Sequence, residues 1–375
     1  MANPFQFGRA VEGDQFTDRE EPLGIVTTCM REGQNAILVS PRRYGKTSLL
    51  KTAVRSINDS GGHAAMVDLM LCSDRRAVAD EVRKALLPLS RGWLANRLAQ
   101  WRELVAARIP HLAITLEHGG YETTFRPVAR DYNWGDSIAA TINLMAELGT
   151  RDAPVALVID EFQKIASIDA GLAGVFKAIV DRTAGMSLIF SGSRRHLMHD
   201  LFTHEGAPLK GTGMLIALDL IARDDMVRFL TQRAAGAGKM MSDSVAESLF
   251  DVAHGIPNTV QLFAFWAYQE ASRRIDDEAL ARGIALAVDA VAPELAVTFS
   301  ELSSVQQRVV LTLAREGAIA HPYEASSLAA FGVEQPATVS KALRRLEENE
   351  IAWSTSRGWQ LVNAAFDQWL LRDER

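Results

Sequence analysis

Residues 36–48 read AILVSPRRYGKTS, and this stretch decides the fold. The apolar run Ala36–Val39 comes directly before a loop of proline, arginine and glycine, and Lys46–Ile57 then has apolar residues at helical spacing. A strand, a glycine-containing loop and a helix in this order form one β-loop-α unit. The backbone N–H groups of such a loop point into one concavity, and the helix N-terminus adds positive partial charge. The stretch therefore predicts a phosphate-binding loop.

Individual residues of this loop have predicted roles. Gly45 lets the backbone approach the phosphates, Lys46 reaches the β- and γ-phosphates, and the hydroxyl of Thr47 binds magnesium. The other loop positions predicted to bind nucleotide are Arg43, Tyr44 and Ser48. The strict pattern begins with glycine, where this chain has Ser40. An ordinary surface turn is the alternative, but the position between a buried strand and a helix favours the phosphate loop.

A second motif is an acidic strand end. The apolar run Val155–Ile159 ends at Asp160 and Glu161. A carboxylate at the end of a buried strand can hold the magnesium ion and its water shell, which is the role predicted for Asp160. Glu161 is predicted to orient or deprotonate the attacking water. An acidic strand end that faces solvent is common, but a phosphate loop upstream at a spacing typical of a βαβ sheet favours the catalytic interpretation.

A third apolar run, Ser187–Ser191, leads into a polar and basic turn. Ser191 and Ser193 are candidates to contact the γ-phosphate or the attacking water. Arg194 or Arg195 could neutralise charge in the transition state, and a solvated basic turn is the equal alternative.

The rest of the chain predicts an α/β architecture with two further parts. Strands alternating with helices indicate a parallel sheet covered on both faces, as in P-loop NTPases, in a core over residues 1–218 with an insertion at about 90–135. Strand signals stop at about residue 220, so residues 219–298 are predicted to form a helical lid subdomain. Residues 299–375 show three helices and then a small hairpin, which is the order of a winged helix.

The third helix of this last part is the candidate DNA-recognition helix. The residues that could reach phosphates or base edges are Lys341, Arg344 and Arg345, with Arg357 in the wing. Residues 301–375 carry eight Lys/Arg and ten Asp/Glu, however, and DNA-binding domains gain most of their affinity from neutralising phosphates. A protein-contact or regulatory module is therefore an equal alternative.

Composition limits the remaining classes of function. The formal net charge is −6, so nucleic-acid binding by bulk charge is not expected. Two cysteines, Cys29 and Cys72, exclude a disulfide framework. No apolar run reaches the length expected of a membrane span, and the N-terminus does not resemble a signal peptide, so we expect no membrane partner and a cytoplasmic location.

Several of these segments together resemble one family. Pro41–Leu49, Ile159–Gln163 and Ser191–Ser193 are similar to the prokaryotic archaeal-type ATPases of the STAND group of AAA+-related P-loop NTPases, as are Phe16–Glu20 and Gly255–Pro257. The resemblance covers nearly the whole chain except residues 90–135. Lys210-Gly211-Thr212 departs from it, because the family often has an aromatic residue, glycine and arginine there.

The resemblance implies further roles. Phe16 and Arg19 would lie near the adenine, and Arg194 would be the sensor arginine. Gly255 and Pro257 would form a nucleotide-sensing turn, although by themselves they indicate only a helix end and a helix start. The family favours ATP over GTP and acts as ATP-driven switches that often form homo-oligomers.

We therefore expect a slow ATPase switch that uses ATP and Mg²⁺. It would couple its nucleotide state to assembly, or to binding of a partner protein or double-stranded DNA through the winged helix. The first alternative is an ATP-regulated DNA-binding protein similar to origin-recognition or transposition regulators. The second is a scaffold ATPase whose winged helix contacts proteins in a defence or stress system.

Overall fold

The computed structural model describes residues 2–10, 19–86, 112–117, 120–125, 133–150, 152–355 and 357–372. Internal contacts divide the chain into two units. The sheet unit comprises Arg19–Pro41 and Lys46–Asp219. The helical unit comprises Met1–Asp18, Arg42–Gly45 and Leu220–Arg375. The expected division at residues 218 and 298 stays a prediction.

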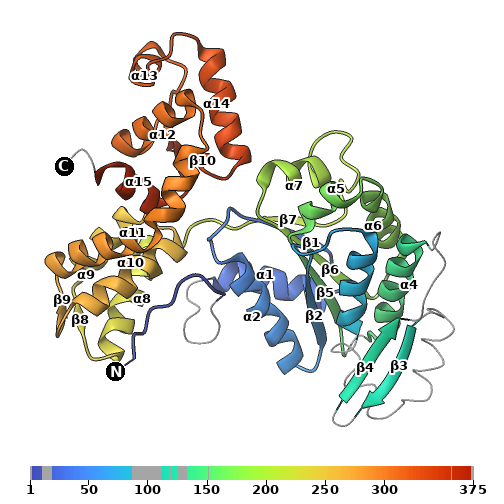
Figure 1. The fold of residues 1–375 in the computed structure, drawn as a ribbon. Helices are drawn as coiled ribbons and strands as arrows, with labels where there is room; N and C mark the ends of the chain where they lie inside the picture. Colours follow the sequence, from blue (N-terminus) through green and yellow to red (C-terminus); the bar gives the residue numbers. More distant parts are fainter. Residues whose placement is uncertain are drawn as a thin grey trace. The chain divides into compact units, whose positions relative to one another are not determined.

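The sheet unit is built on five parallel strands in the order β2-β5-β6-β1-β7 (Figure 1). The strands β5 and β6 are buried along their whole length, as continuous apolar runs in a covered parallel sheet require. Because all five strands run in one direction, their carboxyl ends meet at one edge, where ligands bind in such sheets. The strand bounds are β1 Ala36–Val39, β2 His63–Asp68, β5 Val155–Asp160, β6 Met186–Gly192 and β7 Met214–Ala217.

Helices cover both faces of this sheet. Figure 1 shows α1 and α2 on one face and α4 and α6 on the other. An aromatic cluster fills the core behind the end of β5, with the ring of Phe162 packed edge-on against Phe176 and Phe190. The helix bounds are α1 Glu20–Arg31, α2 Lys46–Asp59, α4 Trp134–Glu147, α5 Ile165–Ile168, α6 Gly171–Arg182 and α7 Arg195–Phe202, with a 3₁₀ turn at Phe162–Lys164 and a helix over 75–86. The antiparallel pair β3 Leu112–Glu117 and β4 Gly120–Phe125 falls in the predicted insertion.

The helical unit contains eight helices among its described residues. They are α8 Arg223–Gly236, α9 Asp243–Val252, α10 Pro257–Glu270, α11 Asp277–Ser300, α12 Ser304–Glu316, α13 Ala325–Ala330, α14 Pro336–Glu348 and α15 Ala364–Leu370. The predicted hairpin forms as the antiparallel strands β10 Ala352–Thr355 and β11 Gly358–Leu361. The region 219–298, which was predicted to be helical, also contains the two-residue strands β8 Met240–Met241 and β9 Arg274–Ile275, which form a short parallel pair.

The helix α11 bears on the expectation that no apolar run is long enough to cross a membrane. By length and composition it could cross a membrane, with a mean hydropathy of 1.4 in its most apolar window. It also contributes Ala279, Leu280 and Ala287 to the core of the helical unit, and Gly283 lies directly against the backbone of Ala267 in α10. These contacts place one side of α11 in the core of the helical unit.

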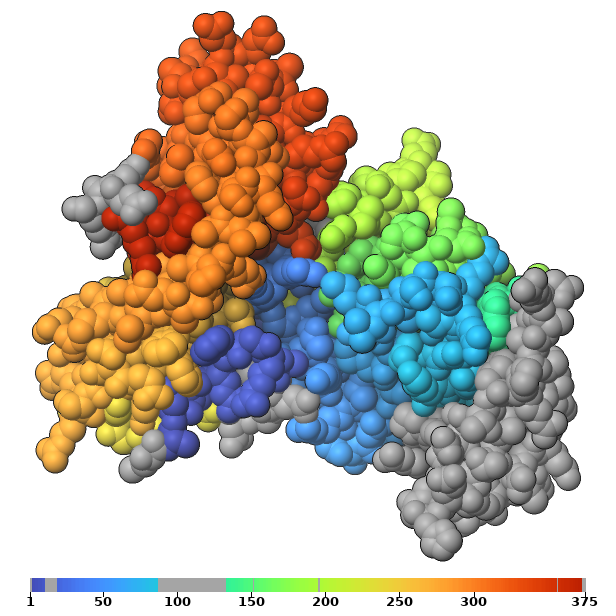
Figure 2. All heavy atoms as spheres, in the orientation of Figure 1, coloured from blue at the N-terminus to red at the C-terminus, as the bar shows by residue number. Residues whose placement is uncertain are grey.

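The N-terminal segment packs along α10 in the same unit. Figure 2 shows it in dark blue against the yellow and orange helices. The side-chain amide of Asn3 donates to the carbonyl of Phe265 at 2.9 Å, and Phe5 is buried in the core. The backbone N–H of Gly8 donates to the side-chain oxygen of Asn258 at 2.9 Å, at the start of α10.

Candidate functional site

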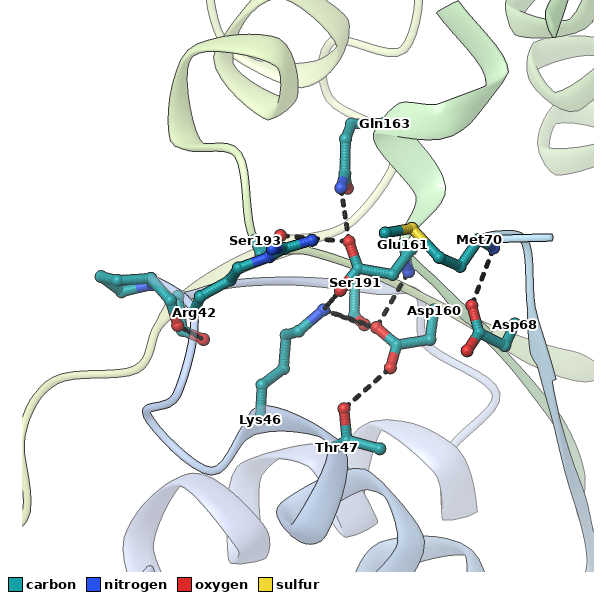
Figure 3. A network of polar contacts seen from close by, with 12 residues as sticks. Arg42, Lys46, Thr47, Asp68, Met70, Asp160, Glu161, Gln163, Ser191 and Ser193 are labelled. Atoms are coloured by element: carbon teal, nitrogen blue, oxygen red, sulfur yellow. Dashed lines mark hydrogen bonds and ion pairs between the residues drawn. The ribbon is translucent and has the colours of Figure 1, made fainter. Parts of the chain in front are cut away.

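The predicted lysine and acidic pair lie together at the carboxyl edge of the sheet. Lys46 begins α2, and its Nζ lies 2.5 Å from Oδ1 of Asp160 and 3.2 Å from Oε1 of Glu161 (Figure 3). The lysine is only 6% exposed, so its charge depends on these carboxylates for compensation. The hydroxyl of Ser191, near the end of β6, donates to Asp160 as well.

Thr47 completes a set of oxygen ligands beside this ion pair. Its hydroxyl donates to Oδ2 of Asp160 at 3.1 Å. Magnesium prefers oxygen ligands and is usually held by one or two carboxylates together with substrate phosphates. The hydroxyl of Thr47 and the carboxylate of Asp160 therefore fit a magnesium ion bound to a phosphate chain.

The electrostatics keep Asp160 ionised. Burial by itself would raise the pKa of Asp160, but attraction by Lys46 and the hydrogen bonds from Lys46 and Ser191 outweigh burial and lower it. The carboxylate is thus charged at neutral pH, as a metal ligand must be.

Asp68 is a third carboxylate at this edge, and the sequence analysis missed it. It ends β2 and is paired in register with Asp160. Burial raises the pKa of Asp68, a hydrogen bond from the N–H of Met70 opposes the rise, and the charges of Asp160 and Glu161 add to it. The available signal was the same as for Asp160, an acidic residue at the end of an apolar run.

Glu161 adopts an uncommon backbone conformation. Its φ of 53° lies in the left-handed region, which costs free energy for a residue with a side chain. Its Oε2 accepts hydrogen bonds from the side-chain amide of Gln163 at 2.5 Å and from the hydroxyl of Ser193 at 3.1 Å. The structure therefore brings Ser193 to the predicted base, together with Gln163, to which the sequence analysis gave no role.

The tip of the phosphate loop, Arg42–Gly45, belongs to the helical unit. Nε of Arg42 lies 3.0 Å from Oε2 of Glu350, and the ring of Tyr44 packs edge-on against Trp353 in β10. Both Arg43 (φ 69°) and Gly45 (φ 87°) are in the left-handed region, which glycine adopts freely and arginine does not. At the start of the loop Ser40 is buried, and its hydroxyl donates to the carbonyl of Pro41.

The predicted sensing turn joins α9 to α10. Pro257 is the first residue of α10, and Gly255 has a φ of 67°, as the helix-end interpretation requires. Its neighbour His254 also has a positive φ, and its Nε2 lies 2.9 Å from Oδ2 of Asp367 in α15. Burial raises the pKa of Asp367, and the hydrogen bond and charge of His254 oppose the rise. The nucleotide-sensing role of the turn stays a prediction.

The remaining predicted residues are spread over both units. Arg194 is exposed directly before α7, Arg19 is buried before α1, and Ser48 is buried in α2. Phe16 lies outside the described residues. The exposed basic residues of the predicted DNA surface are Lys341, Arg344 and Arg345 on α14, and Arg357 between β10 and β11. Two of them, Arg344 and Arg345, are bonded to Glu348.

Comparisons with known proteins show similarity in fold. No protein-family model matches the chain, and no curated protein matches it in sequence. The Walker-type ATPase of Pyrococcus abyssi has a TM-score of 0.67 and 16% identity, with 98% of this chain and 99% of that chain covered. The Orc1 protein of Aeropyrum pernix, solved in complex with DNA, has a TM-score of 0.51 and 13% identity, with coverages of 96% and 94%. The chain thus shares its overall fold with these two solved structures, one of them a Walker-type ATPase.

Proposed function

We propose that this chain binds and hydrolyses ATP with Mg²⁺ and acts as a STAND-type molecular switch. One observation carries the proposal: Lys46, Thr47, Asp160 and Glu161 converge at the carboxyl edge of the sheet. A lysine, a hydroxyl, a metal-binding carboxylate and a base are the parts that phosphoryl transfer needs. The similarity in fold to a Walker-type ATPase supports this assignment.

The residues have distinct roles in this proposal. Lys46 exchanges its contacts with Asp160 and Glu161 for the β- and γ-phosphates, while Thr47 and Asp160 hold magnesium. Magnesium, when bound, neutralises charge that develops on the phosphate oxygens. Glu161 then accepts the proton of the attacking water. Ser191 contacts the γ-phosphate or the water, and Ser193 contacts the water while its hydroxyl still donates to Glu161.

Residues outside the sheet edge complete the proposed nucleotide site. Arg194 serves as the sensor arginine, and Phe16 and Arg19 lie near the adenine. Gly255 and Pro257 form the sensing turn.

The contacts of the loop tip support the switch. Arg42 forms an ion pair with Glu350, which lies just before the hairpin of the proposed winged helix. Tyr44 packs against Trp353 in the first strand of that hairpin. A ligand that changes the loop tip would act directly on that domain, because a ligand shifts a conformational equilibrium through contacts that differ between states. We propose that the domain passes the nucleotide state to a partner or to a second copy of the chain.

A second candidate is an ATP-regulated DNA-binding protein. The exposed Lys341 and Arg344 on α14 favour it, and the similar Orc1 structure is of a complex with DNA. The ion pairs of Arg344 and Arg345 with Glu348 weaken it, because they reduce the charge available to phosphates. Duplex-binding titrations at several salt concentrations separate the two candidates, since phosphate contacts make affinity strongly salt-dependent.

The substitution Glu161→Gln tests the proposed function. The amide cannot accept a proton, so we expect turnover of Mg-ATP to fall by about 10²- to 10⁴-fold, with the Kd for Mg-ATP within about threefold of wild type. The control Glu147→Gln, at the end of α4, should leave turnover unchanged. Equal turnover in Glu161→Gln and wild type would remove Glu161 from the base role, and wild-type turnover that persists in excess EDTA would refute the magnesium site.

A further inference from the structure

Both carboxylate oxygens of Glu161 have assigned partners. Oε1 faces Nζ of Lys46 at 3.2 Å, while Oε2 accepts from Gln163 at 2.5 Å and from Ser193 at 3.1 Å (Figure 3). Lys46 is the partner that nucleotide would draw away, because phosphates compete for its charge. Gln163 and Ser193 carry no charge that phosphates would attract, so they can remain on Oε2 when nucleotide binds.

The side chain of Gln163 is fixed in place. It is 6% exposed and lies on the 3₁₀ turn Phe162–Lys164, whose first residue is held by the aromatic core of the sheet unit. A Cβ atom built on Gly192 would lie 2.3 Å from Oε1 of Gln163. Glycine at position 192 therefore makes room for the amide beside the end of β6.

The direction of the amide follows from charge. Oε1 of Gln163 has no hydrogen-bond partner among the described residues, whereas its Nε2 points at Glu161. The flipped amide would place its oxygen against a carboxylate oxygen, and two acceptors repel each other. The hydrogen bond from Gln163 to Glu161 is thus the arrangement that the site favours.

We propose that Gln163 is a positioning residue that fixes Glu161 for catalysis, an inference that rests on the proposed ATP hydrolysis. By holding Oε2, Gln163 and Ser193 leave Oε1 as the oxygen that faces the nucleotide once Lys46 has moved to the phosphates. Water then donates a proton to Oε1 as its oxygen bonds to the γ-phosphorus. The bond between that phosphorus and the β–γ bridging oxygen breaks, and ADP leaves with the electron pair. Without Gln163 the base would sample several orientations, and misplacement of a catalytic group by about 1 Å can cost about 10²-fold in rate.

The substitution Gln163→Met tests this role, because methionine has a similar length and no N–H donor. In the full chain we expect kcat for Mg-ATP to fall by about 10- to 100-fold, with Ser193 retaining part of the effect, and the Kd for Mg-ATP to stay within about twofold. The control Gln34→Met, at an exposed glutamine before β1, should match wild type. A kcat within about twofold of wild type would overturn the inference, as would a rise in Kd as large as the fall in kcat.

The substitution Gln163→Glu gives a readout that a purely structural role would not move. It keeps the size of the side chain but places a second carboxylate against Glu161, and two carboxylates that share a site raise a pKa. The acid limb of the kcat–pH profile should move upward by about one pH unit or more. An unmoved acid limb would contradict the positioning role, whereas a wild-type chain that hydrolyses no Mg-ATP would refute the proposed function itself.

Discussion

The charged residues at the carboxyl edge of the sheet are buried, and each compensates the charge of another. Lys46 and Asp160 are both nearly inaccessible to water, so each depends on the other and on polar neighbours for compensation. Two of the four non-glycine residues with positive φ among those described, Arg43 and Glu161, are predicted site residues, and a third, His254, directly precedes the predicted sensing turn. Backbone strain of this kind persists where surrounding contacts hold it, and it concentrates at functional sites.

Asp160 should make the stability of the nucleotide-free protein depend on pH. In metal-free buffer at pH 7, Asp160→Asn should lower the free energy of unfolding by about 2–3 kcal/mol, because Lys46 loses the nearer of its two carboxylate partners. The pKa of Asp160 is lowered by folding, so this stabilisation is present above the unfolded value of about 3.9 and is lost as the pH falls through the folded value.

Urea unfolding of the wild type and of Asp160→Asn between pH 7 and pH 3 measures the difference in their free energies of unfolding. It should be constant down to about pH 5 and shrink below about pH 4, where the unfolded chain takes up the proton. A difference that grows as the pH falls would show that Asp160 does not stabilise the folded state in its charged form.

Sequence motifs identified the residues whose signal is local. Lys46, Asp160 and Ser193 each follow directly from a strand end or a loop pattern, and the structure brings them together. Asp68 carries the same local signal, but its place beside Asp160 depends on which strands are neighbours, and the role of Gln163 depends on the direction of its side chain. Neither property can be derived from spacing along the chain.

Elements differ in how strongly their sequences specify them. The apolar periodicity of Ser242–His254 and Pro336–Glu350 predicts helices whose bounds lie close to those of α9 and α14, because many apolar positions repeat on one face. The two-residue strands β8 and β9 are too short to show any alternation. The edge strand β7, at Met214–Ala217, was also missed, since three of its four residues are exposed and it lacks a buried apolar run.

The contact between α10 and α11 predicts an effect on stability. A Cβ atom on Gly283 would lie 2.3 Å from the backbone nitrogen of Ala267, so Gly283→Ala must push the two helices apart. Overpacking of this kind costs about 1–3 kcal/mol, which exceeds the gain of at most about 1 kcal/mol in helix propensity. We expect a lower melting temperature, measured by circular dichroism.

Gly236→Ala is the matched control in the same unit. Gly236 ends α8, and a Cβ atom there would meet no atom within 4 Å. The same change should therefore be neutral or stabilise by up to about 1 kcal/mol. A Gly283→Ala protein as stable as this control would show that the helix pair can relax around the added methyl group.

The residues of the phosphate loop differ in the contacts that they make. Its first residues and Lys46 belong to the sheet unit, whereas Arg42–Gly45 belongs by its contacts to the helical unit. The backbone of this loop continues from β1, whereas the side chains of Arg42 and Tyr44 contact Glu350 and Trp353. Sequence could not predict this division, because Glu350 lies more than 300 positions away from Arg42 along the chain.

The ion pair between Arg42 and Glu350 predicts an effect on nucleotide affinity. Glu350 neutralises Arg42, and its other carboxylate oxygen is buried without a hydrogen-bond partner among the described residues. In Glu350→Gln the positive charge of Arg42 becomes available to phosphates. We expect the Kd for Mg-ATP to fall by about two- to fivefold, the range that an ion pair of up to about 1 kcal/mol allows. By linkage, bound nucleotide should weaken the contact between Arg42 and Glu350 by the same factor.

Glu348→Gln separates this local effect from a change in net charge. Glu348 lies two residues before Glu350 and pairs with Arg344 and Arg345 instead of the phosphate loop. Titration calorimetry with Mg-ATP should therefore give a wild-type Kd for Glu348→Gln and a lower Kd for Glu350→Gln. Equal shifts in the two variants would mean that only the charge of the domain matters. An unchanged Kd in both would mean that the hairpin contact and the nucleotide site are independent, and the loop tip could then not transmit the nucleotide state.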